Sequence, residues 1–265
     1  MKIVLFRHGH SLANQESRIV SSLENGTRTT GGPEGTGFGL SDKGNQEVEE
    51  SAESLVNHIL STIEPSMHTW VRILTSPFLR TRETAAIVDK VLRTAFAAHT
   101  HRHEHPAASP STPSANKSTV SMEVIPKEIH DLRERFFGEF EMEMPSDELY
   151  ARVWHEDASD PFHDRFGVES VAEVTKRMTA VVRDQEFAEK KRLERPYESD
   201  EELLVAKQTK IWTILVSHGD SLQILQAAMR GWSGDRHRQV DHLNTANWRI
   251  VQWCEELAEA HPLIR

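Results

Sequence analysis

An arginine and a histidine follow a short apolar run at the start of the chain. Residues 2–6 are apolar enough to form a buried strand, and Arg7 and His8 come directly after it. A neutral histidine can attack phosphorus as a nucleophile, and a guanidinium can neutralise the oxygens of a phosphoryl group. The pair therefore indicates a site that binds and transfers a phosphoryl group at the end of a strand.

Three further motifs with compatible chemistry occur downstream. Arg80 ends the sequence Ser-Pro-Phe-Leu-Arg, Glu134 lies in Leu-Arg-Glu-Arg-Phe-Phe-Gly, and His218 lies in Val-Ser-His-Gly. The apolar run 211–216 before His218 is the clearest buried strand of the chain. In an open sheet flanked by helices, sites form beyond the carboxyl ends of the strands. We therefore expect His8 and His218 to lie in one site.

In this order, the four motifs resemble the histidine phosphatase superfamily, the phosphoglycerate mutase-like proteins, from residue 1 to about residue 253. The resemblance implies that His8 forms a phosphohistidine and that Glu134 protonates the leaving oxygen and later activates water. It also implies that Arg7, Arg80 and His218 hold the phosphoryl oxygens. Further residues are expected to bind phosphate or substrate: Ser11, Asn14, Gly219, and Arg18 with Arg28 as its alternative.

Strand patterns alternate with helix patterns along the chain, which is typical of a parallel sheet covered by helices. We predict an α/β fold, a three-layer α/β/α sandwich with a mostly parallel sheet like that of phosphoglycerate mutase, formed by residues 1–265 as a single domain. Strands are expected at 2–6, 70–74, 122–125, 211–216 and 246–253, the last at an edge. Helices are expected at 45–60, 77–93, 146–154, 170–192 and 221–229. Residues 15–39 are predicted to be a loop and 194–207 a charged linker.

Residues 94–121 have a different composition from their surroundings. Histidines alternate at 99, 101, 103 and 105, and a stretch rich in Pro, Ser, Ala and Thr follows. We interpret the segment as an inserted low-complexity surface loop. A metal site is the alternative, because alternating histidines of an extended segment share one face. No cysteine or carboxylate cluster accompanies them, so we predict no metal.

Charge and composition exclude several classes of function. The chain carries a net charge of −10, which argues against a nucleic-acid-binding surface. Its single cysteine, Cys254, excludes an internal disulfide. The N-terminal apolar run is too short for a signal peptide, and no stretch has the roughly 20 apolar residues of a membrane span. A cytoplasmic protein without membrane contact is expected, and the sequence specifies no oligomeric state.

Two positions depart from the family pattern. His10 stands where the family usually has Glu or Gln, and we expect it to alter hydrogen bonding around the site. Asp220 follows His218-Gly219 and would repel an anionic substrate unless it turns outward or caps the next helix.

Arg133 and Arg135 flank Glu134, whose role as an acid needs a raised pKa. In an extended segment both arginines would point away from it.

The resemblance implies a metal-independent phosphatase without cofactor, acting on a small phosphorylated metabolite or a phosphoprotein. A phosphoglycerate-type mutase is the first alternative. A mutase must exclude water from its phosphoenzyme, and neither the segment after Glu134 nor the short tail after Trp253 suits that task. A non-catalytic phosphate-binding protein is the second alternative, which the presence of all five catalytic residues disfavours.

Overall fold

Four parallel strands and one antiparallel edge strand form the central sheet. The computed structural model describes residues 1–32, 35–64, 67–104 and 126–251 of the 265-residue chain. The strands of the sheet, in spatial order, are β3 (Lys127–Glu128), β2 (His68–Thr75), β4 (Thr209–Ser217), β1 (Lys2–Arg7) and β5 (Trp248–Val251). Only β5 runs antiparallel to its neighbour, β1. The predicted mostly parallel sheet and the predicted edge strand are confirmed.

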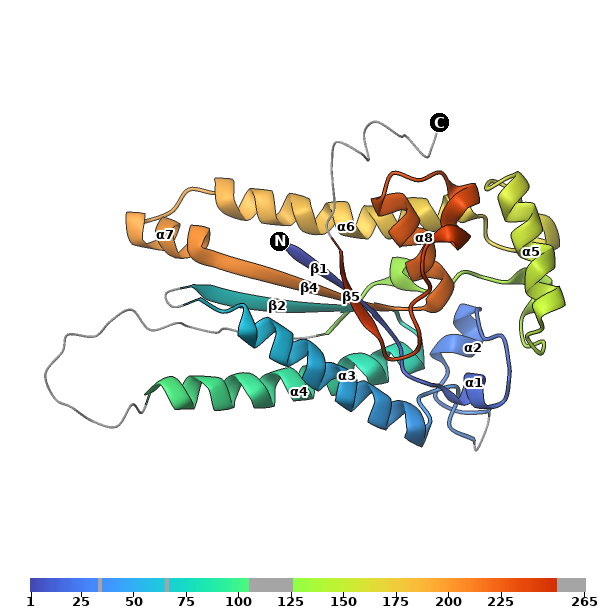
Figure 1. Ribbon diagram of the computed structural model, residues 1–265, viewed down its shortest axis with the longest axis horizontal. Coiled ribbons are helices and arrows are strands. Elements are labelled where there is room, and N and C mark those ends of the chain that lie inside the picture. The colour runs from blue at the N-terminus through green and yellow to red at the C-terminus, as the bar shows by residue number, and fades with distance from the viewer. Residues whose placement is uncertain (33–34, 65–66, 105–125, 252–265) are drawn as a thin grey trace, which may run out of the picture.

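Helices cover both faces of this sheet (Figure 1). On one face lie α3 (Asp42–Ser61) and α4 (Leu79–Glu104), and on the other lie α6 (Val171–Glu194) and α8 (Gly219–Met229). The alternation of side chains along β1 supplies both cores: Val4 and Phe6 pack toward α3 and α4, whereas Ile3 and Leu5 pack toward α6 and α8. This arrangement is the predicted three-layer sandwich.

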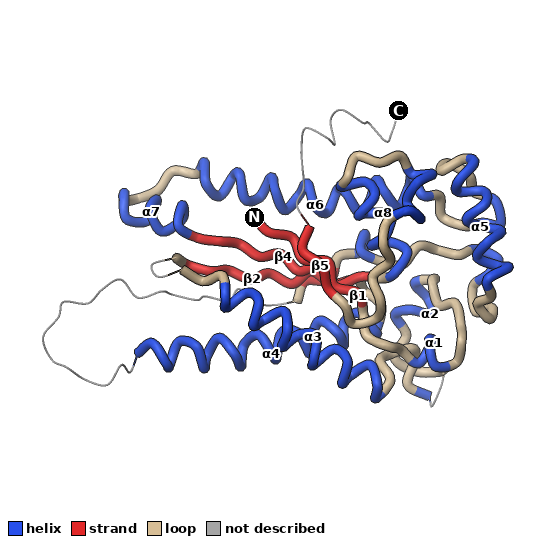
Figure 2. The backbone as a smooth tube through the Cα atoms, in the orientation of Figure 1, coloured by secondary structure: helices blue, strands red, loops and turns tan. Residues whose placement is uncertain are grey.

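A group of short elements gathers at the carboxyl ends of the parallel strands (Figure 2). They are α1 (Leu12–Gln15), α2 (Leu23–Thr27), η2 (His130–Leu132), η3 (Gly138–Phe140), α5 (Asp147–Ser159), η4 (Arg165–Gly167) and η5 (Gly234–Gln239). A separate apolar cluster, which includes Phe137, Phe140 and Val153, joins several of them. These elements surround the edge of the sheet at which the predicted site residues lie.

Several expected boundaries were wrong, and each has a local cause. The segment 94–121 was predicted to be a loop from its first residue, but α4 continues to Glu104, so the histidines at 99, 101 and 103 fall within a helix. Residues 105–121, with His105, and the strand expected at 122–125 lie outside the described residues. Hydrophobic packing of Leu92 and Phe96 against the core extends α4 beyond the predicted end at Arg93.

Two further segments are helical where loops were expected. The linker 194–207 contains α7 (Asp200–Gln208), and the loop 15–39 contains α2. In both, a serine side chain accepts a hydrogen bond from the backbone of the first turn: Ser199 from Glu202 and Ser22 from Asn25. In α7, acidic residues in the first turn also complement the helix dipole. The acidic residues that suggested a charged linker therefore mark the start of helix α7.

No helix in the described part of the chain has the length and apolar character needed to cross a membrane.

The first turn of α3 lies against the segment that follows the nucleophile candidate. Ser41 caps α3 by accepting a hydrogen bond from the Gly44 backbone. A Cβ atom on Gly44 would stand 1.9 Å from the carbonyl oxygen of His10, and one on Gly9 would stand 2.7 Å from the carbonyl oxygen of Gly44. Glycine at position 44 therefore permits α3 to approach the backbone of residues 9 and 10.

We expect Gly44→Ala to destabilise the protein by about 2 kcal/mol or more, because the added methyl group meets backbone that cannot move freely. Asn45→Ala is the matched control, since Asn45 is an exposed neighbour in the same turn. Alanine normally stabilises a helix relative to glycine by about 1 kcal/mol. Urea denaturation measures both variants, and a Gly44→Ala protein as stable as the wild type would contradict the close approach.

Candidate active site

The register of the sheet brings two histidines side by side. Arg7 at the end of β1 pairs with Ser217 at the end of β4, so the next residues, His8 and His218, leave the sheet together. Their ring centroids lie 5.2 Å apart in an edge-to-face arrangement, and both side chains are buried. The predicted shared site at the carboxyl ends of the strands is present.

The hydrogen bonds of His8 define its protonation state. Its Nδ1 lies 2.7 Å from the carbonyl oxygen of Gly9, which can only accept, and Arg80 Nε, which can only donate, lies 3.1 Å from its Nε2. The ring therefore carries its proton on Nδ1 and a lone pair on Nε2. Burial, together with Arg80 and Arg7, lowers the pKa of His8 well below its usual value. Nε2 is a neutral nitrogen poised as a nucleophile.

Ser76 orients the second histidine. Its hydroxyl oxygen lies 2.8 Å from His218 Nε2 and accepts a hydrogen bond from the Phe78 backbone. Within these contacts, the hydroxyl proton is directed at His218 Nε2, which places the imidazole proton on Nδ1. Burial and then Arg80 lower the pKa of His218 well below its usual value. His218 therefore offers an Nδ1 donor without the positive charge that would accompany protonation.

Three buried nitrogen donors beside His8 have no hydrogen-bond partner within the described ranges. They are Nε of Arg7, Nη1 of Arg80 and Nδ1 of His218. A buried donor without a partner costs about 1–3 kcal/mol, and proteins rarely tolerate three of them together. Two of the three belong to guanidinium groups, which bind phosphate oxygens in charge-assisted hydrogen bonds. The arrangement suits an oxyanion with several acceptor oxygens.

Glu134 follows η2 and reaches the N-terminal turn of α8. Its Oε1 accepts hydrogen bonds from the backbone of Arg135 at 2.9 Å and from the hydroxyl and backbone of Ser221 at 3.1 and 3.3 Å. Burial, and then the nearby Asp220 carboxylate, raise the pKa of Glu134. These three donors all contact Oε1, which leaves Oε2 to carry the proton of the acid form.

The two arginines that flank Glu134 point away from it, as predicted. Arg135 is fully buried and binds Asp157 with both guanidinium nitrogens, at 2.7 and 2.8 Å. Its Nη1 also contacts Asp220 at 3.2 Å. Arg133 pairs instead with Glu169 at 3.0 Å. Neither guanidinium group therefore pairs with the Glu134 carboxyl, where its charge would lower the pKa of Glu134.

Asp220 neither turns outward nor caps its helix, the two arrangements that would keep it from repelling an anionic substrate. The side chain is buried and lies between Arg135 and Arg238, with contacts of 3.2 and 3.4 Å. Burial alone would raise the pKa of Asp220, but Arg135, His237 and Arg238 outweigh it and lower the pKa. Asp220 is an ionised carboxylate that repels a second negative charge on Glu134.

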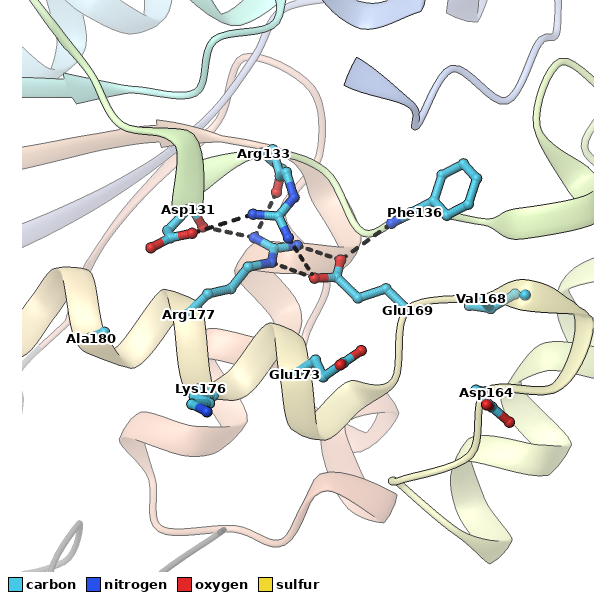
Figure 3. A pocket seen from close by; sticks show the side chains of 11 residues that line it. Asp131, Arg133, Phe136, Asp164, Val168, Glu169, Glu173, Lys176, Arg177 and Ala180 are labelled. Carbon is cyan, nitrogen blue, oxygen red and sulfur yellow. Dashed lines mark hydrogen bonds and ion pairs between the residues drawn. The ribbon is translucent and has the colours of Figure 1, made fainter. Parts of the chain in front are cut away.

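A clamp from α6 holds the backbone around Glu134 (Figure 3). Arg177 donates to the carbonyl oxygens of Asp131, Arg133 and Glu134 at 2.7, 2.9 and 3.3 Å, and it binds both oxygens of Glu169 at 2.8 Å. The Glu169 carboxylate also accepts from the backbone of Phe136. These groups border a surface groove of about 720 Å³. The position of the Glu134 backbone is therefore set by Arg177 and Glu169, two residues that make no hydrogen bond to His8 within the described part of the chain.

The predicted substrate-binding residues divide into two groups. Ser11 and Asn14 form a capping box at the start of α1, where each bonds the other's backbone. Arg18 is exposed and donates to the Met142 carbonyl. The structure brings none of these three into hydrogen bonding with the unpaired donors. Gly219 does lie at the site, because a Cβ there would stand 3.0 Å from Arg7 Cζ.

His10 bonds the start of α3 and not the nucleophile. Its Nδ1 lies 2.8 Å from the Ser41 hydroxyl oxygen, and its backbone donates to Glu47 at 3.4 Å. Arg28, the alternative to Arg18, contacts Asn25 and Glu24 on α2.

Several residues of the site escaped the sequence reasoning. Ser76 and Ser221 lie inside motifs that were singled out for their neighbours, so their positions carried a signal that was not used. The clamp residues Glu169 and Arg177, and the buried Asp157, have no such local signal, because the residues of segment 131–135 that they bind are 22 to 46 positions away in sequence. Among the described residues, no group of three or more His, Cys, Asp or Glu side chains is arranged as a metal site.

The structure is thus an α/β sandwich in which buried, unpaired donors surround His8 at the carboxyl ends of the strands. The family model of the histidine phosphatase superfamily (branch 1) matches residues 115–261, more than half of the chain. The chain belongs to this superfamily. The matched range includes Glu134 and His218, whereas Arg7, His8 and Arg80 precede it and are joined to them by the geometry described above.

Solved structures of the same fold cover nearly all of the chain. The mycobacterial glucosyl-3-phosphoglycerate phosphatase bound to VO3 is 17% identical with a TM-score of 0.54, covering 95% of this chain and 98% of its own. A putative α-ribazole-5′-phosphate phosphatase of Escherichia coli is 16% identical with a TM-score of 0.53, covering 95% and 90%. A protein described as mycobacterial hydrolase 1 is 19% identical with a TM-score of 0.55, covering 95% and 97%. A search of curated proteins gave no significant match.

We expect Asp157→Asn to destabilise the protein by about 3–5 kcal/mol, because the buried Arg135 would lose its two-point carboxylate partner and keep only the longer contact with Asp220. Glu156→Gln is the control: it removes the neighbouring ion pair with Arg165, which is largely exposed, and should cost less than about 1 kcal/mol. Chemical denaturation of both variants tests this. Equal, small losses would show that the Arg135–Asp157 pair contributes no more than a surface pair.

Proposed function

We propose that this protein is a phosphomonoester hydrolase that acts through a phosphohistidine on Nε2 of His8. The observation that carries the proposal is the group of three buried, unpaired donors, from Arg7, Arg80 and His218, beside a histidine whose lone pair is on Nε2. A phosphoryl group placed there would satisfy all three donors and present phosphorus to the nucleophile. Electrostatic stabilisation of this kind is the main contribution of proteins to phosphoryl transfer.

In the first step, Nε2 of His8 attacks phosphorus and the bond from phosphorus to the leaving oxygen breaks. Arg80 Nε donates a hydrogen bond to Nε2 in the free protein. As the N–P bond forms, it donates this hydrogen bond to a phosphoryl oxygen instead. Glu134 gives its proton to the leaving oxygen and becomes a carboxylate. The raised pKa of Glu134 supplies the proton, and the lowered pKa of His8 keeps the nucleophile neutral.

In the second step, the Glu134 carboxylate removes a proton from water, and the resulting hydroxide attacks phosphorus. The N–P bond breaks, which returns the electron pair to His8 Nε2 and releases inorganic phosphate. Glu134 is protonated again and the cycle closes. Arg7 and Arg80 hold the phosphoryl oxygens through both steps, and the chemistry requires no metal cofactor.

The names of two similar solved structures support hydrolysis and a small substrate. Solved structures of this fold include proteins described as phosphatases of glucosyl-3-phosphoglycerate and of α-ribazole 5′-phosphate. Both named compounds are phosphate esters of small metabolites, so a substrate of this class is proposed here. Transfer within a phosphoglycerate, as in a mutase, is the competing reaction that the experiment must separate from hydrolysis.

We expect wild-type protein to release phosphate from a panel of small sugar and glycerate phosphates in the presence of a chelator, and His8→Ala to release none. The panel includes the substrates named for the two phosphatases above and 3-phosphoglycerate. Quenching with a 32P-labelled substrate should trap an acid-labile, base-stable label in the wild type only. His155→Ala, at an exposed histidine of α5, is the matched control and should behave as wild type.

Isomerised phosphoglycerate with little free phosphate would instead identify a mutase. Phosphate binding without label or turnover would favour a non-catalytic protein. Loss of activity with chelator would contradict the proposed chemistry.

We expect Glu134→Gln to lower kcat by about 10²- to 10⁴-fold on alkyl phosphates and much less on p-nitrophenyl phosphate, whose leaving group needs no proton. Because the pKa of Glu134 is raised, the acid form is present below that pKa, and wild-type activity should fall as pH rises through it. This basic limb should be absent in Glu134→Gln. Glu139→Gln, at an exposed neighbour, is the control, and equal losses on both substrate types would exclude Glu134 as the proton donor.

A further inference from the structure

His242 contacts the site from the loop between η5 and β5, which no motif of the chain had singled out. Its Nε2 lies 2.6 Å from Nη1 of Arg7. The loop is fixed to the end of β1 by backbone hydrogen bonds: Arg7 donates to Asn247, and Ala246 donates to the carbonyl of His8, each at 3.0 Å. The imidazole is exposed on its outer side, so it lies between Arg7 and the surface.

The direction of this hydrogen bond is defined by the arginine. A guanidinium can only donate, so His242 Nε2 must offer a lone pair and the imidazole must be neutral. Partial burial, and then Arg7 and Arg238, lower the pKa of His242 to about 4, with Asp220 acting in the opposite direction. His242 is therefore an acceptor at any ordinary pH.

The two hydrogens of Arg7 Nη1 are both engaged by this loop. One is donated to His242 and the other to the Leu243 carbonyl oxygen at 2.9 Å. The guanidinium edge formed by Nε and Nη2 remains, and Nε is buried without a partner among the described residues. Arginine binds phosphate best through two parallel hydrogen bonds from one edge. The loop thus selects the edge that the phosphoryl group meets.

Gly219 permits this arrangement. A Cβ atom at position 219 would stand 3.0 Å from Arg7 Cζ and 3.0 Å from His242 Cε1. The guanidinium and the imidazole therefore both rest against the bare Cα of the first residue of α8. The Arg7 guanidinium is thus held between the His242 imidazole and the backbone of Gly219.

We propose that His242 is a positioning residue for Arg7, holding the guanidinium so that its Nε–Nη2 edge faces the phosphoryl group. The inference rests on the proposed function and deepens it. His242 acts through Arg7, and it is distinct from the residues that transfer protons or phosphorus. Its effect should therefore appear in oxyanion binding as well as in turnover.

The test compares His242→Ala and His242→Gln with wild type in three measurements. These are calorimetric affinity for inorganic phosphate, inhibition by orthovanadate, and kcat/KM on the best substrate of the panel. We expect His242→Ala to weaken all three by about 10- to 100-fold, since small misplacement of a catalytic group has effects of this size. His242→Gln should recover most of the loss, because its amide oxygen can accept from Arg7.

Two controls separate positioning from a structural role. Asp241→Ala alters an exposed neighbour in the same loop and should leave all three values unchanged, and melting temperatures should agree among the variants. In an Arg7→Lys background, the ammonium has no planar fork to orient, so His242→Ala should have no further effect.

The other outcomes overturn the positioning role, the proposed hydrolase, or both. Wild-type values in His242→Ala would show that Arg7 needs no such support. Additive losses in the Arg7→Lys background would show that His242 acts on the ligand or the fold directly. Weaker phosphate binding in His242→Ala without turnover by any variant would preserve the positioning role and reject the hydrolase. Absence of phosphate and vanadate binding by the wild type would reject both.

Discussion

Positive charge is concentrated where β1 and β4 end, and much of the structure exists to make this concentration tolerable. Arg7 and Arg80 both lie close enough to His8 to lower its pKa, and Arg80 is itself buried. Burial and the Arg7 charge lower the pKa of Arg80 to about 10, although Glu134 and Glu141 oppose them. Like charges held together in a medium of low dielectric constant repel strongly unless an anion compensates them. The two arginines thus repel each other in the free protein, and a bound oxyanion would compensate this repulsion.

The carboxylates are arranged in order of distance from this charge. The pKa of Glu134, the carboxyl that faces Arg7 and Arg80, is raised by its burial and by Asp220. Asp220 is held ionised by Arg135, and Arg135 is held in turn by Asp157. A buried chain of alternating charges therefore runs from the acid into the core beneath α5. Each member is compensated by the next, which lets one carboxyl remain neutral while another remains charged a short distance away.

The sequence predicted the fold and the centre of the site because both rest on local patterns. Arg7, His8 and His218 follow apolar runs directly, and parallel pairing then makes them neighbours. The surrounding groups could not be predicted in this way. Arg135 and Asp220 are 85 positions apart, so the sequence around Asp220 did not show that its side chain is buried against Arg135. His242 was missed for the same reason, since its partner Arg7 is 235 positions away.

The clamp on the loop around Glu134 has a further consequence for how this chain can change. Arg177 grips residues 131, 133 and 134 through their carbonyl oxygens, a group that every amino acid carries. These contacts do not depend on the side chains of the residues whose carbonyls accept, and groove residues outside the clamp, such as Asp164 and Lys176, can be substituted without displacing Glu134. The position of the Glu134 carboxyl is therefore set by contacts to the backbone. The side chains on the outer surface beside it can change independently of that position.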